Sequence, residues 1–247
     1  MSDDVTVDRV LGGRLSLRQP SVGYRFAIDP VLMAAAVKAH PEGKVLDIGS
    51  GVGTASFCLM SRSPGITVTG LDIQSELLAL AVENASRNGF EDRISFVTGD
   101  LRDPSLFEPK SFDHIMANPP HFIGGSHTPP GDASKATAHI EEATLEDWVK
   151  AASRWVKDRG CMTMIHRADR VHEVVAAVAK RFGDINILPL WPRPGRPARR
   201  VIVQGLKASR GPARILPGLV LHDQIDKYTA EARAVLEDGQ AIDLDCY

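Results

Sequence analysis

Short apolar runs alternate with amphipathic stretches from residue 44 onward, and this alternation restricts the chain to few folds. Short apolar runs are typical of buried strands, and the stretches between them predict helices that cover a parallel sheet. We expect strands at Lys44–Ile48, Ile66–Leu71, Ile94–Thr98, Phe112–Ala117, Cys161–His166, Ile185–Trp191 and Arg200–Leu206. We expect helices at Val31–Ala39, Thr54–Ser61, Ser75–Asn88, Leu145–Val156, Ala168–Phe182 and Tyr228–Leu236.

The last two expected strands differ from the others because no helix fits between them. Only a proline-rich stretch, Pro192–Ala198, separates them, and so short a connection requires antiparallel pairing. The pattern therefore predicts an α/β, Rossmann-like fold with a seven-stranded, mainly parallel sheet and an antiparallel edge hairpin. We expect a single domain over 1–247, with an N-terminal segment (1–40), the core sheet (41–206) and a C-terminal extension (207–247).

Composition narrows the class of protein further. The net charge is −2, with 43% hydrophobic and 24% charged residues, which is typical of a globular protein and excludes a polybasic coat. Three cysteines far apart in the sequence (Cys58, Cys161 and Cys246) disfavour a disulfide framework. The N-terminus lacks the features of a signal peptide, and no apolar stretch has the length of a membrane span. We expect a cytoplasmic protein.

A glycine-rich turn follows the first expected strand. Gly49, Gly51 and Gly53 alternate after Asp47, just before an expected helix. Glycines allow a tight turn that approaches a ligand closely, and a helix N-terminus offers free N–H groups. A dinucleotide-binding fingerprint has the spacing G-x-G-x-x-G, whereas this turn is G-x-G-x-G. It resembles the S-adenosylmethionine (SAM) motif of class I methyltransferases.

Acidic residues end the first three expected strands and suit the parts of such a cofactor. Asp47 is expected to face an ammonium group. Asp72, about 20 residues beyond the last glycine, is expected to accept both ribose hydroxyls. Asp100 is suited to the exocyclic amine of an adenine.

The most specific motif is Asn118-Pro119-Pro120-His121, which follows the fourth expected strand. It resembles the NPPY signature of enzymes that methylate a nitrogen conjugated to a π system, although His121 replaces tyrosine. The resemblance implies that Asn118 contacts both substrate and cofactor. It also implies that the Asn118 side-chain oxygen and the Pro119 carbonyl hold the two N–H bonds of the amine, with Pro120 stiffening the turn. His121 and Phe122 are expected to stack on the target base.

The chain as a whole resembles bacterial adenine-N6-methyltransferases acting on valine tRNA. The segment Gly23–Leu32 resembles the family's upstream segment, which implies a cofactor contact at Arg25, and Tyr228-Thr229 resembles the start of its closing helix. Arg196, Arg199 and Arg200 resemble its hairpin arginines, which implies RNA contacts. Two alternatives remain open: N-methylation of a protein glutamine amide or an rRNA guanine amine, and a non-catalytic SAM-binding RNA module.

Basic residues are concentrated near the expected hairpin. The stretch 191–214 has no acidic residue, and its basic residues are Arg193, Arg196, Arg199, Arg200, Lys207, Arg210 and Arg214. Phosphate contacts by such residues position a nucleic acid without reading its sequence. The sequence therefore predicts that one basic hairpin is the docking site for RNA, and we expect this RNA to be tRNA. His121, His127 and His139 lack a helical i, i+4 spacing, so no metal site is expected.

Overall fold

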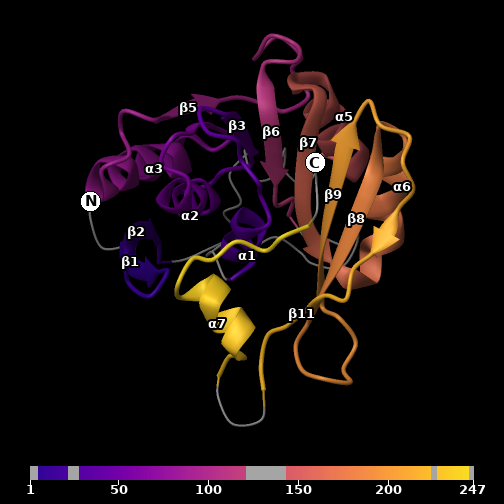
Figure 1. Ribbon diagram of the computed structural model, residues 1–247. Coiled ribbons are helices and arrows are strands. Elements are labelled where there is room, and N and C mark those ends of the chain that lie inside the picture. Colours follow the sequence, from indigo (N-terminus) through magenta and orange to yellow (C-terminus); the bar gives the residue numbers. More distant parts are fainter. Residues whose placement is uncertain (1–4, 22–27, 121–142, 224–226, 245–247) are drawn as a thin grey trace, which may run out of the picture.

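The computed structural model describes residues 5–21, 28–120, 143–223 and 227–244, and its centre is a twisted sheet (Figure 1). Along the sheet the order is β10-β8-β9-β7-β6-β3-β4-β5, with β11 also paired to β8. Strands β3 to β7 run parallel, and β9 runs antiparallel to both of its neighbours. The strands are β3 Lys44–Ile48, β4 Thr67–Asp72, β5 Ile94–Thr98, β6 Phe112–Ala117, β7 Val156–Arg167, β8 Phe182–Trp191, β9 Arg200–Lys207, β10 Arg214–Ile215 and β11 Leu219–Val220.

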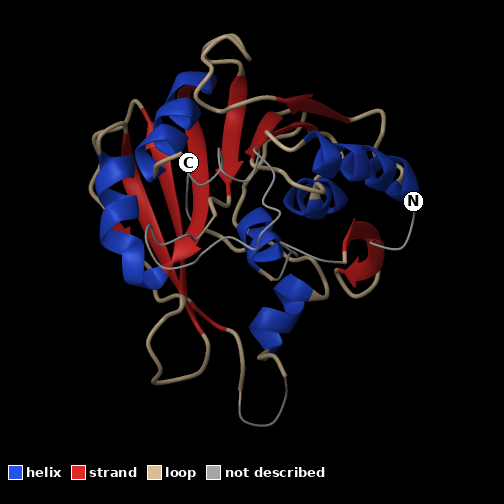
Figure 2. Ribbon diagram, turned by 180° about the vertical axis from the view of Figure 1, so that it is seen from behind, coloured by secondary structure: helices blue, strands red, loops and turns tan. Residues whose placement is uncertain are grey.

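Helices cover both faces of this sheet (Figure 2). They are α1 Asp29–Ala35, α2 Thr54–Arg62, α3 Ser75–Asn88, α5 Leu145–Trp155, α6 Val171–Ala179 and α7 Ala230–Leu236, with a 3₁₀ turn η1 at Ala168–Arg170. One buried cluster lies under α1, α2, α3 and α7, and contains Leu32 and Phe57. The other lies under α5 and α6, and contains Trp155 and Val174. The layered α/β architecture predicted from the sequence is confirmed.

Local sequence signals account for several element ends. Gly89 ends α3 in the left-handed region with φ of 69°, where glycine has no steric cost. Thr144 starts α5 with a capping box, in which its hydroxyl accepts from the Asp147 N–H while the Asp147 carboxylate accepts from Thr144. The predicted helix at Ala168–Phe182 is shorter, because η1 precedes it and β8 already begins at Phe182.

The antiparallel pairing of β8 with β9 is confirmed, but β8 is not the edge of the sheet. Residues 214–215 and 219–220 pair with it in parallel as β10 and β11. Each of these strands has two residues, which is too short for a hydrophobic period to reveal. The sheet therefore has nine strands where seven were predicted.

An N-terminal β-hairpin, β1 Val5–Val10 and β2 Leu15–Pro20, was also not predicted. It packs against α3, where the Asn84 amide pairs with the backbone of Arg18 as a strand would. Asn84 also donates to the Val52 carbonyl at 3.1 Å and is fully buried. The hairpin therefore supports the glycine turn through one side chain.

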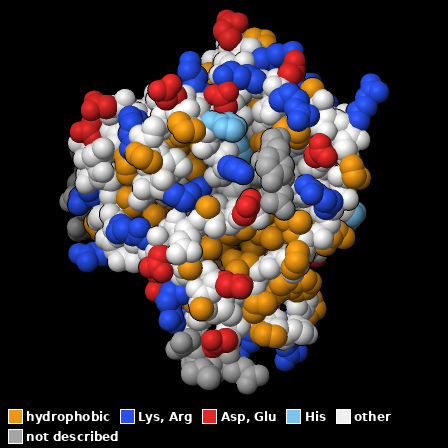
Figure 3. Space-filling model, in the orientation of Figure 1, with side chains coloured by type: hydrophobic (Ala, Val, Ile, Leu, Met, Phe, Trp, Pro, Cys, Tyr) orange, Lys and Arg blue, Asp and Glu red, His pale blue; other side chains and the backbone are white. Residues whose placement is uncertain are grey.

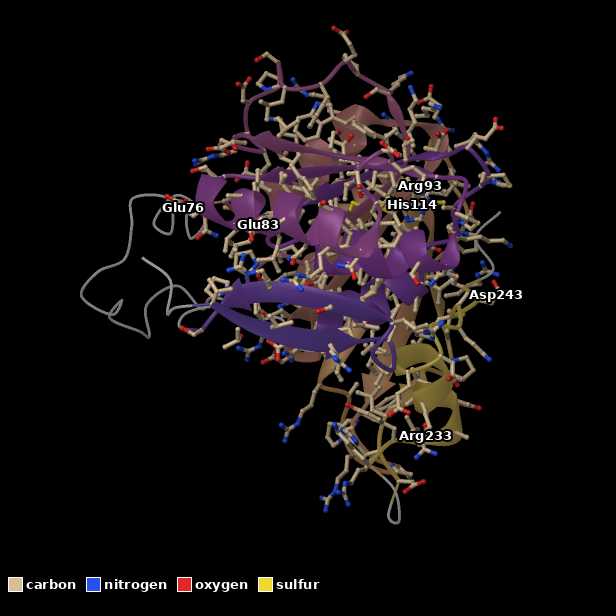
Figure 4. All side chains as sticks on the ribbon, turned by 90° about the vertical axis from the view of Figure 1, so that its left-hand side faces the viewer. Glu76, Glu83, Arg93, His114, Arg233 and Asp243 are labelled. Carbon is tan, nitrogen blue, oxygen red and sulfur yellow. The ribbon has the colours of Figure 1, made fainter. Side chains whose placement is uncertain are left out.

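A buried polar chain fixes the register of the central strands. His114 Nε2 on β6 lies 2.8 Å from Thr163 Oγ1 on β7, which accepts from Gln204 on β9 at 2.7 Å. Burial lowers the pKa of His114 to about 3, so this imidazole is neutral near pH 7. Figure 4 shows His114 inside the layered core.

Candidate functional site

The segments predicted to form the site meet at the carboxyl ends of the parallel strands. Ile48 at the end of β3 pairs with Leu71 on β4 and with Ala117 on β6. Parallel strands in register end together, so the residues that follow them are neighbours. The structure therefore brings the turn that starts at Gly49 beside Asn118, and both lie beside the end of β4.

The three glycines of the turn have different roles. All have positive φ, at 72° for Gly49, 54° for Gly51 and 87° for Gly53. A Cβ at Gly49 would lie 2.7 Å from the ring of Trp148, and one at Gly53 would lie 2.5 Å from Phe57. A Cβ at Gly51 would meet nothing within 4 Å. The outer glycines are thus required by the protein's own packing, whereas Gly51 leaves open space for a ligand.

Asp47 is a buried carboxylate at this turn, 1% exposed. Ser56 on α2 donates a hydrogen bond to it at 2.7 Å. Burial nevertheless raises the pKa of Asp47 to about 7, because desolvation outweighs the hydroxyl. A cationic group at this position would stabilise the charged form, which is what an ammonium-bearing ligand supplies.

Asp72 closes β4 and holds the turn in place. It accepts from Gly51 N–H at 2.8 Å and from Gln74 N–H at 3.0 Å. Burial raises its pKa, while these backbone hydrogen bonds oppose the rise. Asp72 thus lies at the turn beside the space that Gly51 leaves open, within reach of ligand hydroxyls there.

Unpartnered hydroxyls complete the surroundings of the turn. Within the described residues, Ser50 Oγ and Thr54 Oγ1 are buried without a hydrogen-bond partner. Each such group costs about 1–3 kcal/mol, a cost that polar atoms of a ligand would offset. Buried acids, an open glycine and unpartnered hydroxyls together fit a ligand with an ammonium group and sugar hydroxyls, as predicted for the cofactor.

Asp100 has a different environment from the other two acids. Its carboxylate is held by Arg102, with Nη2 at 2.6 Å from Oδ2 and Nε at 3.0 Å from both oxygens. It also accepts from the Arg102 N–H. Asp100 is therefore engaged within the chain, and a contact with an adenine amine stays a prediction. Arg25, the further predicted cofactor contact, lies outside the described residues.

The Asn-Pro-Pro motif begins directly after β6. Asn118 is half-buried with a buried side-chain oxygen, Pro119 is buried and Pro120 is half-buried. His121 and Phe122, predicted to stack on the base, lie outside the described residues. Trp148, which sequence reasoning missed, seals the turn from α5: it is 4% exposed and its ring abuts Gly49. The capping box at Thr144 was the signal that places Trp148 in the first turn of this helix.

The basic stretch 191–214 does not form one patch. Arg193, Arg196 and Arg199 are exposed at the loop between β8 and β9. Lys207, at the far end of β9, donates to the Val156 carbonyl at 3.0 Å. An eight-residue strand spans roughly 24 Å, so Lys207 and Arg210 belong to the opposite edge of the sheet. The prediction of a single basic hairpin therefore holds for only part of the stretch.

Arg200, predicted to contact RNA, has a partner in the chain. Its Nε lies 2.7 Å from Asp29 Oδ2, and the two side chains are 33% and 13% exposed. This ion pair joins the start of β9 to the start of α1, 171 residues apart in sequence. Arg200 therefore differs from Arg196 and Arg199, which are exposed, in that its charge is paired within the chain.

The face seen in Figure 3 carries interspersed acidic and basic side chains above and a gathering of apolar side chains around and below α1. Among the described residues, no group of three or more His, Cys, Asp and Glu side chains is arranged to hold a metal ion. In the same part of the chain, no helix is both long and apolar enough to cross a membrane.

The strand order and the glycine turn beside Asn-Pro-Pro define the class of protein, a methyltransferase with a Rossmann-like fold. The methyltransferase domain family matches residues 39–182. The tRNA1(Val) (adenine(37)-N6)-methyltransferase of Porphyromonas gingivalis is 30% identical over 71% of this chain and 74% of its own. That of Bacteroides thetaiotaomicron is 29% identical over 71% and 73%. The chain belongs to the methyltransferase domain family and, within it, to the family of these relatives.

A solved structure supports the fold independently. A protein from Agrobacterium tumefaciens described as a predicted O-methyltransferase has a TM-score of 0.72 and 25% identity, covering 86% of this chain and 97% of that one. The Rossmann-like fold predicted from the sequence is therefore shared with this solved structure.

Proposed function

We propose that the protein transfers a methyl group from SAM to the exocyclic amine of an adenine in tRNA. The observation that carries this proposal is the pairing of Ile48 with Ala117, because it sets the glycine turn and Asn118 side by side. The names of the relatives supply the nucleic-acid class and the target base. The exposed arginines of the β8–β9 loop agree with an RNA substrate.

The residues of the chain divide the work of binding and orientation. Asp47 would pair with the ammonium of the bound cofactor, Asp72 would accept hydrogen bonds from its ribose hydroxyls, and the open space at Gly51 would leave room for it beside the turn. When bound, SAM would supply an electrophilic methyl group on a sulfonium sulfur. The leaving group would be the neutral thioether that remains. The Asn118 oxygen and the Pro119 carbonyl accept hydrogen bonds from the two N–H groups of the amine. These hydrogen bonds orient the nitrogen lone pair toward the methyl group. The cationic product amine then loses a proton to water.

No strong general base is needed at this site. The nitrogen of an adenine amine is a weak nucleophile because its lone pair is delocalised, so its orientation by two fixed acceptors accounts for the rate. Prolines 119 and 120 hold the acceptors in place since each fixes its own φ. Burial of the Asn118 oxygen strengthens its hydrogen bond to the amine.

The test is Asn118→Ala. Removing one fixed acceptor is expected to lower the rate of methyl transfer by about 10²–10³-fold, while SAM affinity changes little because the turn and both acids remain. The measurement is transfer of labelled methyl to total tRNA, with N6-methyladenosine identified by mass spectrometry. Retention of the wild-type rate would contradict the role of Asn118.

O-methylation is the second candidate, because the A. tumefaciens structure carries that description. A hydroxyl has one hydrogen to donate, so one of the two acceptors, the Asn118 oxygen or the Pro119 carbonyl, would receive no hydrogen bond from it. Product analysis separates the two reactions: N6-methyladenosine supports the amine, and a methylated hydroxyl contradicts it. Parallel assays with ribosomal RNA and protein fractions test the guanine and glutamine alternatives.

A further inference from the structure

The basic side chains around the lower ends of β7, β8 and β9 fall into two groups. Arg167 pairs with Asp169, Arg170 with Glu173 and Arg200 with Asp29. The exposed cations Arg193, Arg196, Arg199 and Lys227 form no ion pair within the described residues. The charge of the first group is neutralised by the chain itself, so only the second group offers its charge to a partner.

Two of these cations are brought together by a tight turn. Arg196 N–H donates to the Arg193 carbonyl at 3.2 Å, and Gly195 between them has φ of 71°. With Pro194 second and Gly195 third, this is a type II turn, whose end residues have Cα atoms less than about 7 Å apart. The two arginine side chains therefore start from neighbouring backbone positions, from which both guanidinium groups can reach one anion.

The turn rests on a rigid base formed by the C-terminal part of the chain. Leu221 N–H donates to the Trp191 carbonyl at 2.8 Å, and His222 N–H donates to the Pro192 carbonyl at 3.1 Å. Trp191 is itself fixed, because its indole N–H donates to the Pro217 carbonyl. The segment 217–222 therefore extends β8 beyond the sheet as a supporting strand.

This supporting strand also places Lys227. His222 stacks on Tyr228 with ring centroids 5.4 Å apart, and Lys227 Nζ lies 4.9 Å from the centroid of Tyr228. Lys227 is thus held at the same end of the molecule as Arg193, although 34 positions apart in sequence. Figure 1 shows the β8–β9 loop beside the chain that follows β11, below the sheet, as the hydrogen bond between His222 and Pro192 requires.

The location relative to Asn118 follows from the register. Ala117 on β6 pairs with Met164, and Arg167, three residues further along β7, pairs with Arg200 on β9. Three strand spacings of about 4.8 Å separate β6 from β8. Arg193 lies three residues beyond Leu190, which pairs with Arg200, so the turn is roughly 20 Å from Asn118. Phosphates of a single strand are about 3.4 Å apart along a stacked helix, so this distance spans roughly six nucleotides.

We propose that Arg193, Arg196 and Lys227 form a phosphate clamp that holds the RNA backbone several nucleotides from the target adenine. This deepens the proposed function and rests on it. Guanidinium groups at the ends of the turn engage one phosphate in a bidentate fashion, and Lys227 engages a neighbouring one as a point charge. The clamp contributes affinity and orientation but touches neither the methyl group nor the amine.

The experiment compares Arg193→Gln/Arg196→Gln and Lys227→Gln with the control Arg210→Gln. Arg210 is exposed, lies in the same basic stretch and forms no ion pair in the described chain, but it is at the opposite edge of the sheet. The readouts are tRNA affinity against salt concentration, the KM and kcat for tRNA, and SAM affinity.

The double variant is expected to weaken tRNA binding about tenfold or more and to lower the slope of log affinity against log salt by about 0.7, since it removes both partners of one single-strand phosphate. Lys227→Gln is expected to lower the slope by about 0.7. The KM for tRNA rises, while kcat at saturating tRNA and SAM affinity stay within about twofold, as do all values for Arg210→Gln.

Equal losses in the double variant and in Arg210→Gln would overturn the clamp. Failure of the proposed function has a different signature, because the wild-type protein would then leave no N6-methyladenosine in tRNA. If the wild-type protein methylates tRNA and the clamp variants bind tRNA as Arg210→Gln does, the clamp alone is overturned. Loss of SAM binding in a clamp variant also overturns it, because the effect would then pass through the fold.

Discussion

The glycine turn and the β8–β9 loop lie on the same side of the sheet, and their charged residues have opposite surroundings. At the turn the charges are buried: Asp47 is 1% and Asp72 7% exposed, and burial raises the pKa of both. At the loop Arg193 and Arg196 are exposed. The two carboxylates are already desolvated in the folded protein. The two guanidinium groups would be desolvated only on binding a partner.

This difference determines range and selectivity. A desolvated acid interacts strongly with a cation at short range and weakly with ions in the solvent. Exposed arginines attract a polyanion from a distance but discriminate little among sequences. Under the proposed function, this side of the sheet would combine a selective cofactor site with a permissive RNA site.

Asp47→Asn tests the buried side of the comparison and has the largest expected effect. Loss of a charge-assisted hydrogen bond to an ammonium is worth about 1.5–3 kcal/mol, so SAM affinity at pH 8 should fall about 10–100-fold. The measurement is calorimetric titration with SAM, with Asp92→Asn at the surface as the control. Unchanged affinity would remove Asp47 from the cofactor site.

The same variant carries a pH signature. The pKa of Asp47 is raised to about 7 in the folded protein, so a proton must leave before a cation binds, and wild-type affinity should fall about tenfold per unit below pH 7. The ligand-free fold binds this proton more tightly than the unfolded chain, so its stability falls as the pH rises from about 4 to about 7. Asp47→Asn should flatten both dependences, and persistence of either slope would argue against Asp47 as its source.

Gly49→Ala and Gly51→Ala separate packing from ligand space. Both positions have positive φ, which costs an alanine about 1–2 kcal/mol. At Gly49 the added Cβ also meets Trp148 at 2.7 Å, so the free energy of unfolding should fall by about 2–4 kcal/mol. Gly51→Ala should cost only the backbone term and instead weaken SAM binding. Denaturant titration and SAM affinity measure the two effects, and equal stability losses would contradict the assignment.

Arg200→Gln and Arg199→Gln give the smallest and most discriminating contrast. Arg200 pairs with Asp29, whereas its neighbour Arg199 is exposed. We expect Arg200→Gln to lower the free energy of unfolding by about 1 kcal/mol and Asp29→Asn to reproduce this loss. Arg199→Gln should leave stability unchanged and weaken tRNA binding. Thermal unfolding and filter binding provide the readouts, and a reversed pattern would make Arg200 the RNA contact.

The sequence predicted those parts of the fold that depend on local pattern. The bounds of β3, β5, β6 and α3 match the expected ranges, because strong apolar periodicity and a glycine cap specify them. The β1–β2 hairpin was missed although Leu15 and Leu17 alternate with partly exposed residues and Gly12-Gly13 form its turn. Strands β10 and β11 left no readable period in sequence.

The site was predictable to the same extent. The glycine turn, Asp47 and Asp72 follow strand ends, and parallel strands in register bring such residues together. The partners of Arg200 and Lys207 depend on tertiary packing. Only the folded chain reveals which of the seven basic residues are neutralised, since Asp29 and Arg200 are joined by no local pattern.

The short strands β10 and β11 also bear on self-association. An exposed edge strand offers unpaired N–H and C=O groups to other chains, and covering it prevents sheet-to-sheet aggregation. β10 and β11 cover β8, the long strand at one end of the sheet, with four residues in total. The opposite edge is β5, which has five residues and is bordered by β4 alone in the described sheet. Of the two edges, the longer one is therefore covered and the short one is left open, so that little strand surface remains on which fibrils could grow.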